Sequence, residues 1–341
     1  MSDPKVSVVI PMYNCERYIL KCLNSLLVQS ISEYEVIIVN DGSTDNSERL
    51  VVTFIDTCKA KNFRLISKTN GGISSARNVG IEEASGDWLT FVDADDWVER
   101  DFLKSMLASV ENTNADFCIS GYFKYFEDTG KKQACYSPEN NCCTRDIAIE
   151  KIYYNAPISR MYSRTICMRN GVRFDERLHV GEDCAFNFDY LCYARTCVMI
   201  NERQYIYRIN LNSITHRNID PERRKYSFES AKRFWTSFSN SAIIEKAFHT
   251  NRYLAESIFG ALLWDVICSL LEKDKKNYLN IKKDPIAEYI IDNYEPKSSY
   301  KEKLFVFCLK HRLTLLLQVT VKLYYGKHLR TFWKKLFHTQ Y

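Results

Sequence analysis

The sequence lacks the short motifs that mark several common ligand sites. Its 341 residues contain neither Gly-x-Gly-x-x-Gly nor Gly-Lys-Ser/Thr, which excludes the dinucleotide fingerprint and the P-loop. The six histidines form no His-Glu-x-x-His or similar cluster, so we do not expect a zinc site. None of the thirteen cysteines belongs to a Cys-x-x-Cys pair and their number is odd, so we predict buried, reduced thiols rather than disulfides.

The chain also has few glycines and prolines and no low-complexity segment. The apolar stretch 304–325 is interrupted by Lys310-His311-Arg312, and the part that follows is too short to span a bilayer. The first residues lead directly into a strand, so we expect no secretory signal and a cytoplasmic protein. The net charge is +5, but it is unevenly distributed: the segment from Lys301 onward contains nine Lys or Arg residues and one acidic residue. That segment carries +8, which leaves −3 for the rest of the chain.

Apolar runs and helical patterns alternate through the first part of the chain. We expect strands, each followed by a helix, at 6–10, 35–39, 63–66 and 88–92. Short connections between these elements favour a parallel sheet with right-handed crossovers. We therefore predict an α/β domain over residues 1–220 and a helical, basic region over residues 221–341.

Three local expectations concern where elements begin and end. Pro11 should end the first strand, because proline lacks the N–H that a ladder needs. Asp45, followed by Glu48, should form a capping box at the start of the second helix. The charged run 273–283 should be a solvated connector between helices.

Polar or turn-forming residues follow each of the four predicted strands. These strand ends are Tyr13-Asn14, Asp41-Gly42, Asn70-Gly71 and Asp93-Asp95. Because the carboxyl ends of parallel strands meet at one edge of a sheet, the four ends predict one pocket. Asp93, Asp95 and Asp96 would repel one another unless Mg²⁺ or Mn²⁺ bound among them. An arbitrary Asp-x-Asp more often caps a helix, but its place after a buried strand favours the metal.

Four segments, in this order and at this spacing, carry a resemblance to a known family. They are Val-Ser-Val-Val-Ile-Pro-Met-Tyr-Asn, Val-Asn-Asp-Gly-Ser-Thr-Asp, Asn-Gly-Gly-Ile-Ser-Ser-Ala-Arg-Asn-x-Gly and Phe-Val-Asp-Ala-Asp-Asp-Trp. With them the chain resembles the GT-A family 2 glycosyltransferases of the bacterial surface-polysaccharide type. The match is specific over residues 5–110 and looser as far as Ser213. It implies a Rossmann-like, mostly parallel sheet flanked by helices, with a helical C-terminal extension.

The resemblance implies how a nucleotide would be bound. Asp41 would accept a hydrogen bond from the uracil imide, with Pro11 and Tyr13 lining the base. Arg77 would face the nucleotide side of the pocket. The alternative for Arg77 is an ordinary charge on a helix surface.

The resemblance also implies roles around the diphosphate. Asp93 would hold ribose or sugar hydroxyls, and Asp95 would bind the metal that bridges the diphosphate. Arg208 and Ser213 would cover the pyrophosphate. Whether Asp96 shares the metal with Asp95 stays open.

A glycosyl transfer also needs a base that deprotonates the acceptor hydroxyl as it attacks. Glu182 and Asp183 precede an apolar helical pattern, and acids at a helix N-terminus are favoured by the dipole without any catalytic role. By resemblance, Asp183 is the base and Glu182 orients the acceptor or the sugar. A single displacement would then invert the anomeric centre.

We therefore expect an inverting, Mn²⁺- or Mg²⁺-dependent hexosyl- or N-acetylhexosaminyltransferase. It would move a sugar from a UDP-sugar to a hydroxyl of a lipid-linked saccharide in surface-polysaccharide biosynthesis. The alternative is a non-catalytic sugar-nucleotide-binding scaffold on the same fold, which should have lost Asp95 or Asp183. A processive synthase would need several membrane spans and a Gln-x-x-Arg-Trp element, and the sequence shows neither.

The basic segment 301–341 predicts a peripheral contact with the inner face of the cell membrane. Its Lys and Arg residues alternate with bulky apolar and aromatic residues, which suits an anionic lipid surface better than nucleic acid. The alternative is a helix that packs on the catalytic body.

Overall fold

The protein comprises two compact units in a computed structural model that describes most of the chain. The described residues are 3–136, 140–145, 149, 157–178, 182–209, 227–237, 241–271, 274–296 and 300–325. The first unit is Met1–Glu176 with Phe186–Asn210, and the second is Arg177–Ala185 with Leu211–Tyr341. The predicted boundary at residue 220 lies outside the described residues. The sequence also placed 177–185 in the first domain, whereas the structure assigns it to the second unit.

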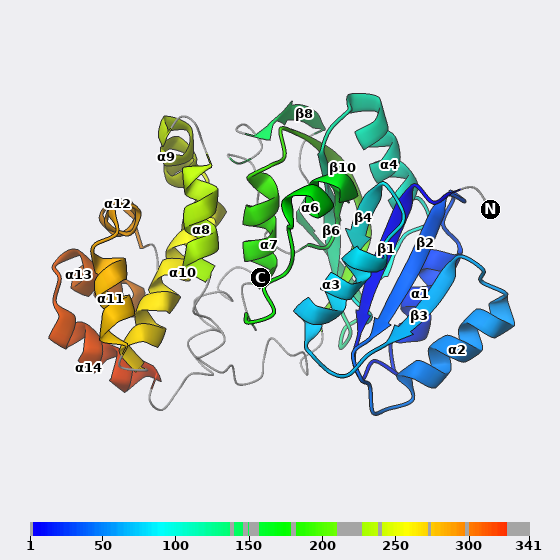
Figure 1. The fold of residues 1–341 in the computed structure, drawn as a ribbon, viewed down its shortest axis with the longest axis horizontal. Coiled ribbons are helices and arrows are strands. Elements are labelled where there is room, and N and C mark those ends of the chain that lie inside the picture. The colour runs from blue at the N-terminus through cyan, green and yellow to red at the C-terminus, as the bar shows by residue number, and fades with distance from the viewer. Residues whose placement is uncertain are drawn as a thin grey trace. The chain divides into compact units, whose positions relative to one another are not determined.

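The first unit is an α/β sandwich built on one sheet (Figure 1). Its strands are β1 (Val6–Met12), β2 (Tyr34–Asn40), β3 (Phe63–Ser67), β4 (Trp88–Phe91), β5 (Trp97–Val98), β6 (Phe117–Phe126), β7 (Lys131–Tyr136), β8 (Asn141–Thr144), β9 (Arg160–Ser163) and β10 (Thr196–Ile209). Its helices are α1 (Ile19–Leu27), α2 (Ser47–Cys58), α3 (Ile73–Glu83), α4 (Phe102–Thr113), α6 (Arg164–Asn170) and most of α7 (Glu182–Leu191).

The described strands follow the order β3-β2-β1-β4-β9-β6-β10-β5, with β7 beside β6 and β8 beside β10. Strands β3, β2, β1 and β4 are parallel neighbours, and β6 and β10 pair in parallel. The antiparallel strand β9 lies between β4 and β6, and the short β5 pairs antiparallel with β10. The predicted mostly parallel α/β sheet is confirmed.

Alternate residues of β1 build the packing on the two faces of the sheet. Val6, Val8 and Ile10 are buried in a core shared with α1, α2 and α4. Val9 points to the other face, where it lies against Gly80 of α3. Helices α1 and α3 therefore cover opposite faces of the central strand, as Figure 1 shows.

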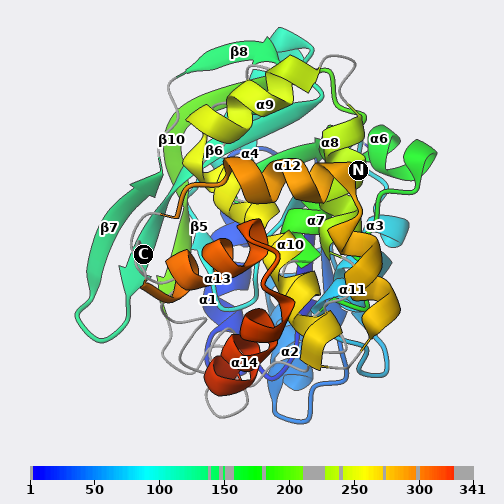
Figure 2. The same ribbon diagram turned by 90° about the vertical axis from the view of Figure 1, so that its left-hand side faces the viewer.

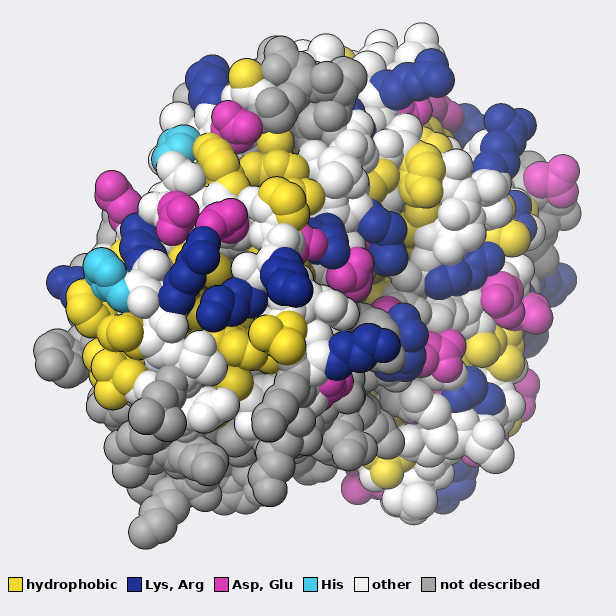
Figure 3. All heavy atoms as spheres, turned by 60° about the vertical axis from the view of Figure 1, so that its left-hand side comes forward, with side chains coloured by type: hydrophobic (Ala, Val, Ile, Leu, Met, Phe, Trp, Pro, Cys, Tyr) yellow, Lys and Arg dark blue, Asp and Glu magenta, His cyan; other side chains and the backbone are white. Residues whose placement is uncertain are grey.

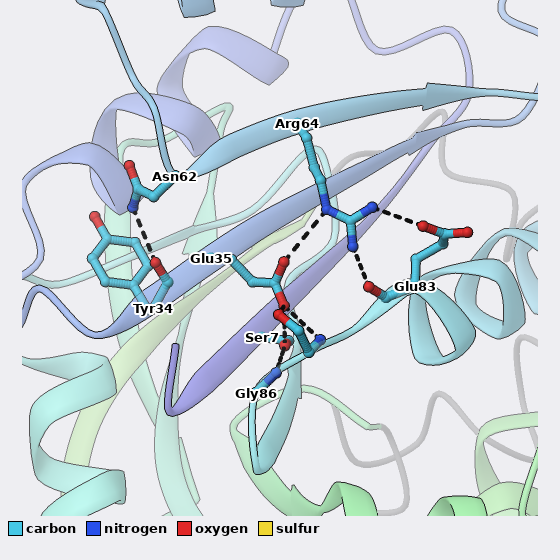
Figure 4. Close-up of polar contacts among 8 residues, drawn as sticks. Ser7, Tyr34, Glu35, Asn62, Arg64, Glu83 and Gly86 are labelled. Atoms are coloured by element: carbon cyan, nitrogen blue, oxygen red, sulfur yellow. Dashed lines mark hydrogen bonds and ion pairs between the residues drawn. The ribbon is translucent and has the colours of Figure 1, made fainter. Parts of the chain in front are cut away.

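A cluster of polar side chains links the amino-terminal ends of the strands, at the edge of the sheet away from the predicted site (Figure 4). The half-buried Glu35 carboxylate accepts from the Ser7 hydroxyl at 2.7 Å and from the Ser85 N–H and hydroxyl at 2.7 and 2.6 Å. Arg64 of β3 pairs with the same carboxylate at 3.4 Å. Burial alone would raise the pKa of Glu35, but the hydrogen bonds from Ser85 and Ser7 outweigh it and lower the pKa. The cluster joins β1, β2 and β3 to the turn before β4.

Two of the local expectations in this unit are wrong. β1 continues through Pro11 to Met12, with Pro11 paired in register to Val39, so the proline sits within the strand. Helix α2 has Asn46 at its N-cap, and Asp45 instead accepts from the Ser47 backbone N–H at 3.0 Å. The Glu48 side chain binds the Asn40 amide and the Ser67 hydroxyl, so no capping box forms.

The described part of the second unit from residue 227 onward is mainly helical, and Figure 2 shows these helices in yellow-green to red. They are α8 (Ser227–Thr236), α9 (Ser241–Thr250), α10 (Arg252–Leu271), α11 (Lys275–Lys282), α12 (Pro285–Asn293), α13 (Tyr300–Lys310) and α14 (Thr314–Tyr325). Helix α10 is the centre of the unit and contacts α8, α9, α11, α12 and α14. Most of the connector predicted at 273–283 is helix α11, which Asp274 caps by accepting from the Asn277 N–H at 3.0 Å.

The predicted apolar stretch 304–325 forms two helices that break at the Lys310-His311-Arg312 triplet. Phe305, Leu317 and Val321 are buried inside the second unit. No described helix is long and apolar enough to cross a membrane. Lys and Arg side chains lie beside exposed apolar ones on the face shown in Figure 3.

Candidate functional site

The loop after β4, residues Asp93–Asp96, is here called the acidic turn. The Asp96 backbone N–H closes it by donating to the Asp93 carbonyl oxygen at 3.0 Å. Burial, reinforced by the Asp93 charge, raises the pKa of Asp95 to about 6. Burial and the Asp95 charge also raise the pKa of Asp96 well above its usual range. The turn thus concentrates negative charge where little water screens it, a setting that a bound cation would relieve.

Asp96 uses both carboxylate oxygens to hold β10. Its Oδ1 accepts from the Arg208 backbone N–H at 2.7 Å, and its Oδ2 accepts from the Tyr205 hydroxyl at 2.7 Å. The residue is only 1% exposed. Both carboxylate oxygens of Asp96 are therefore bonded to the protein, whereas a metal at Asp95, alone or shared with Asp96, stays a prediction.

Arg77 reaches the acidic turn from helix α3. Its Nη2 lies 3.0 Å from Asp93 Oδ1, and its guanidinium stacks 5.0 Å from the centre of the Phe174 ring. The side chain is 2% exposed, which excludes the alternative of a surface helix charge. Arg77 therefore partly neutralises the Asp93 carboxylate and orients it.

Asp41, at the end of β2, organises the loop that leads into α3. Its buried carboxylate accepts from the Gly71 and Gly72 backbone N–H groups at 2.9 and 2.7 Å, and from Lys68 Nζ at 2.8 Å. Gly72 has a φ of 90°, a conformation that strains other residues. A carboxylate offers about four acceptor positions, so Asp41 keeps room for one further donor.

The loops after β1 and β2 are joined to one another. Asn14 Oδ1 accepts from the Thr44 backbone N–H at 2.8 Å. Pro11 is buried within β1, while Tyr13 is 41% exposed at its end. The exposed ring of Tyr13 and the buried carboxylate of Asp41 thus lie on neighbouring loops, as a binding edge requires.

Arg208, on β10, makes a hydrogen bond, an ion pair and contacts with aromatic rings. Its Nε donates to the Asp95 carbonyl oxygen at 2.7 Å, and its Nη1 lies 3.1 Å from Glu127 Oε1. The guanidinium carbon is 4.7 Å from the Tyr18 ring centre and 4.9 Å from that of Trp97. The arginine therefore joins β10 to the acidic turn, and its contact with a pyrophosphate stays a prediction.

Comparison with known proteins identifies the family. The model described as "Glycosyl transferase family 2" matches residues 7–170. EpsH of Bacillus subtilis (strain 168), which is named as a glycosyltransferase, is 32% identical over 292 residues, or 80% of this chain and 78% of EpsH. The chain belongs to glycosyl transferase family 2.

Further relatives support the assignment and the fold. EpsJ of Bacillus subtilis, also named as a glycosyltransferase, is 34% identical over 220 residues, which are 62% of this chain and 63% of EpsJ. The crystal structure of Staphylococcus aureus TarS residues 1–349 with UDP-GlcNAc superposes with a TM-score of 0.67 at 20% identity, covering 94% of this chain and 92% of that one. At that identity, the likeness shows the GT-A fold alone.

The first unit of this family 2 glycosyltransferase contains seven of the predicted site residues. They are Pro11, Tyr13, Asp41, Arg77, Asp93, Asp95 and Arg208. Glu182 and Asp183 form the first turn of α7 and belong to the second unit, so their relation to that group stays a prediction. Ser213 lies outside the described residues.

The carboxylates of the acidic turn fit a divalent cation whose remaining coordination positions would be filled by phosphate oxygens of the substrate. The described residues contain no group of three or more His, Cys, Asp or Glu side chains that could hold a metal alone. Mg²⁺ and Mn²⁺ commonly take one or two carboxylates and leave other positions to water and phosphate oxygens. Asp95, whose pKa is raised by burial and by the Asp93 charge, would supply such a carboxylate.

Sequence reasoning missed three residues that hold the site together. Lys68 pairs with Asp41, Glu127 pairs with Arg208, and Tyr205 binds Asp96. Tyr205 lies three residues before Arg208, within the long strand β10, which the sequence analysis did not predict. Glu127 stands at a hairpin turn, where a single acid carries no sequence signal.

Proposed function

We propose that this family 2 glycosyltransferase transfers a hexosyl or N-acetylhexosaminyl group from a UDP-sugar to a saccharide hydroxyl, with inversion. The acidic turn is the observation that carries the proposal, because its buried carboxylates suit a metal–diphosphate complex. Solved TarS structures hold UDP-GlcNAc and UDP, which supports a uridine nucleotide. TarS is named a poly(ribitol-phosphate) beta-N-acetylglucosaminyltransferase, and this name supports transfer to a polymeric acceptor in surface-polysaccharide biosynthesis. The lipid linkage of the acceptor is our proposal.

Five predicted site residues of the first unit bind the nucleoside and sugar parts of the donor. Asp41 receives the uracil N–H at its remaining acceptor position, beside Pro11 and Tyr13. Asp93, oriented by Arg77, accepts from ribose or sugar hydroxyls.

Diphosphate and acceptor residues complete the reaction. Mn²⁺ or Mg²⁺ held by Asp95 would act as a Lewis acid that stabilises the departing diphosphate. Arg208 and Ser213 cover the pyrophosphate. Asp183 takes the proton of the acceptor hydroxyl as that oxygen bonds to the anomeric carbon, and the bond from this carbon to the diphosphate oxygen breaks. Glu182 orients the acceptor.

The membrane contact is proposed for the C-terminal end of the chain. Phe305 and Leu317 are buried within the second unit, so α13 and α14 belong to its core. Residues 326–341 contain four Lys or Arg and no acid. Each such cation near an anionic surface contributes about 1 kcal/mol. We assign reversible binding to an anionic leaflet to this segment.

A donor screen tests the proposal. The full chain is incubated with UDP-, GDP- and dTDP-sugars, with Mn²⁺ or Mg²⁺ and no acceptor, and nucleotide release is measured. UDP release from one UDP-hexose or UDP-N-acetylhexosamine is expected, and release from GDP- or dTDP-sugars alone would overturn the uridine assignment. Tight UDP-sugar binding without release, with or without saccharide acceptors, would favour the scaffold alternative.

A further inference from the structure

A chain of hydrogen bonds links the two ends of the acidic turn through β10. The Asp93 backbone N–H donates to the Tyr205 hydroxyl oxygen at 3.1 Å, and that hydroxyl donates to Asp96 Oδ2 at 2.7 Å. Asp96 Oδ1 accepts from the Arg208 backbone N–H at 2.7 Å. A single tyrosine hydroxyl therefore bridges the first and last residues of a turn that contains Asp95.

The same turn is held from the side of α1. The Val98 backbone N–H donates to the Ser25 hydroxyl at 3.2 Å, and Gln29 Nε2 donates to the Glu99 carbonyl oxygen at 2.8 Å. β5, which directly follows the turn, pairs with β10 through Trp97 and Ile206. The backbone after the turn is thus fixed on two sides, and the Tyr205–Asp96 bridge fixes the turn itself.

The ring of Trp97, in β5, is surrounded by other side chains. Lys21 Nζ lies 3.2 Å from the centre of the Trp97 ring, and the Tyr125 ring meets Trp97 edge-on at 5.0 Å. Arg208 approaches the same ring at 4.9 Å. Surrounded in this way, Trp97 holds β5 in place and is poorly suited to stack on a sugar.

We propose that Tyr205 and Asp96 are positioning residues that hold the acidic turn against β10 and so set the places of Asp93 and Asp95. Asp96 is then an acceptor for β10 and takes no part as a metal ligand. The inference rests on the proposed function for what the turn binds, whereas the bridge itself can be tested without any substrate. A displacement of about 1 Å in such a group can lower turnover by roughly 10²-fold.

The test compares three single-site variants of the full chain. Tyr205→Phe removes only the bridging hydroxyl. Asp96→Asn keeps the shape but replaces one acceptor oxygen by a donor group. Tyr34→Phe is the matched control, because the buried Tyr34 hydroxyl donates to the Leu26 carbonyl oxygen at 2.6 Å, away from the acidic turn. All three variants lose a buried hydrogen bond, so only a positioning role distinguishes the first two.

The first readout is amide hydrogen exchange without ligand. In Tyr205→Phe, the Asp93 N–H should exchange roughly tenfold faster, as expected when one hydrogen bond is lost. In Asp96→Asn, the one remaining acceptor oxygen can serve only one of the two donors, so the Arg208 N–H or the Asp93 N–H held by Tyr205 should exchange faster. The control should leave both amides unchanged. Unchanged exchange of Asp93 in Tyr205→Phe would overturn the bridge, whatever reaction the protein catalyses.

The second readout is Mn²⁺ binding in the presence of UDP, followed by the electron paramagnetic resonance of free Mn²⁺, together with UDP-sugar hydrolysis. Both variants should need about tenfold more Mn²⁺ for half-saturation and lose roughly 10²-fold in kcat, with the KM for the donor within about twofold. Faster exchange with unchanged Mn²⁺ binding would overturn the positioning role. If the wild-type protein bound neither UDP nor Mn²⁺, the proposed function would fail while the exchange data still decided the bridge.

Discussion

Gly80 allows helix α3 to lie close against β1. Its replacement by alanine should have two opposed effects on stability, a gain in helix propensity and a steric overlap with Val9. A Cβ atom at position 80 would lie 2.1 Å from Val9 Cγ1 and 2.9 Å from Val9 Cγ2. Val9 is fully buried in the centre of the sheet, and a β-branched side chain has few alternative rotamers. The added methyl group must therefore push α3 away from β1.

The two effects differ in size. Replacing glycine by alanine inside a helix stabilises it by about 1 kcal/mol through propensity. Overpacking a well-filled core costs about 1–3 kcal/mol, and a contact of 2.1 Å belongs at the upper end. We therefore expect Gly80→Ala to lower the free energy of unfolding of the first unit by about 2 kcal/mol. Since α3 carries Arg77 to Asp93, UDP binding should weaken as well.

A double-mutant cycle with Val9→Ala separates the clash from other effects. Without both Val9 γ-methyl groups, the nearest Val9 atom to the new methyl would be Cβ at 3.1 Å. The double variant should then be more stable than the sum of the single effects by about 1–3 kcal/mol. Hydrogen exchange of the β1 and β2 core amides measures the stability of this unit alone. A Gly80→Ala variant that is more stable than wild type would refute the reasoning.

Four further outcomes follow from the site and the fold. Asp95→Ala should abolish metal-dependent UDP-sugar hydrolysis; full turnover of chelator-treated wild type would contradict the metal role. Asp183→Asn should keep UDP binding but lower transfer by roughly 10²–10⁴-fold, whereas near-normal transfer would move the base to Glu182. Because the Glu35 pKa is lowered from 4.5, its stabilisation is present above that pH and is lost as the pH falls below it. The stability difference between wild type and Glu35→Gln should therefore shrink on acidification, and a constant difference would count against the cluster. Deleting residues 326–341 should release the protein from anionic vesicles at low salt while sparing hydrolysis, and equal binding would reject that anchor.

Local pattern was enough to predict the alternating strands and helices of the first part of the fold and the edge of the sheet where their polar ends lie. Strands β1, β2 and β4 are largely apolar and largely buried runs, and each is followed by polar or turn-forming residues. Such runs must be buried on both faces, so the helices between them have to cover a parallel sheet. The carboxyl ends of those strands then meet at one edge, which brings Asp41 near the loop of Gly71 and places Arg77 beside Asp93.

Other features depend on contacts between residues far apart in the chain, and only the tertiary structure decided them. Strand β10 pairs with β6 and β5, and that pairing brings Tyr205 to Asp96, 109 residues away. The sequence of the acidic turn did not distinguish the environment of Asp96 from that of Asp95. Only the structure shows that both oxygens of Asp96 are bonded to β10. Pro11 stayed within β1 because the parallel strand β2 holds its neighbours Ile10 and Met12 in register. Local propensity does not encode these hydrogen bonds, because the partner that satisfies each group is chosen by the whole fold.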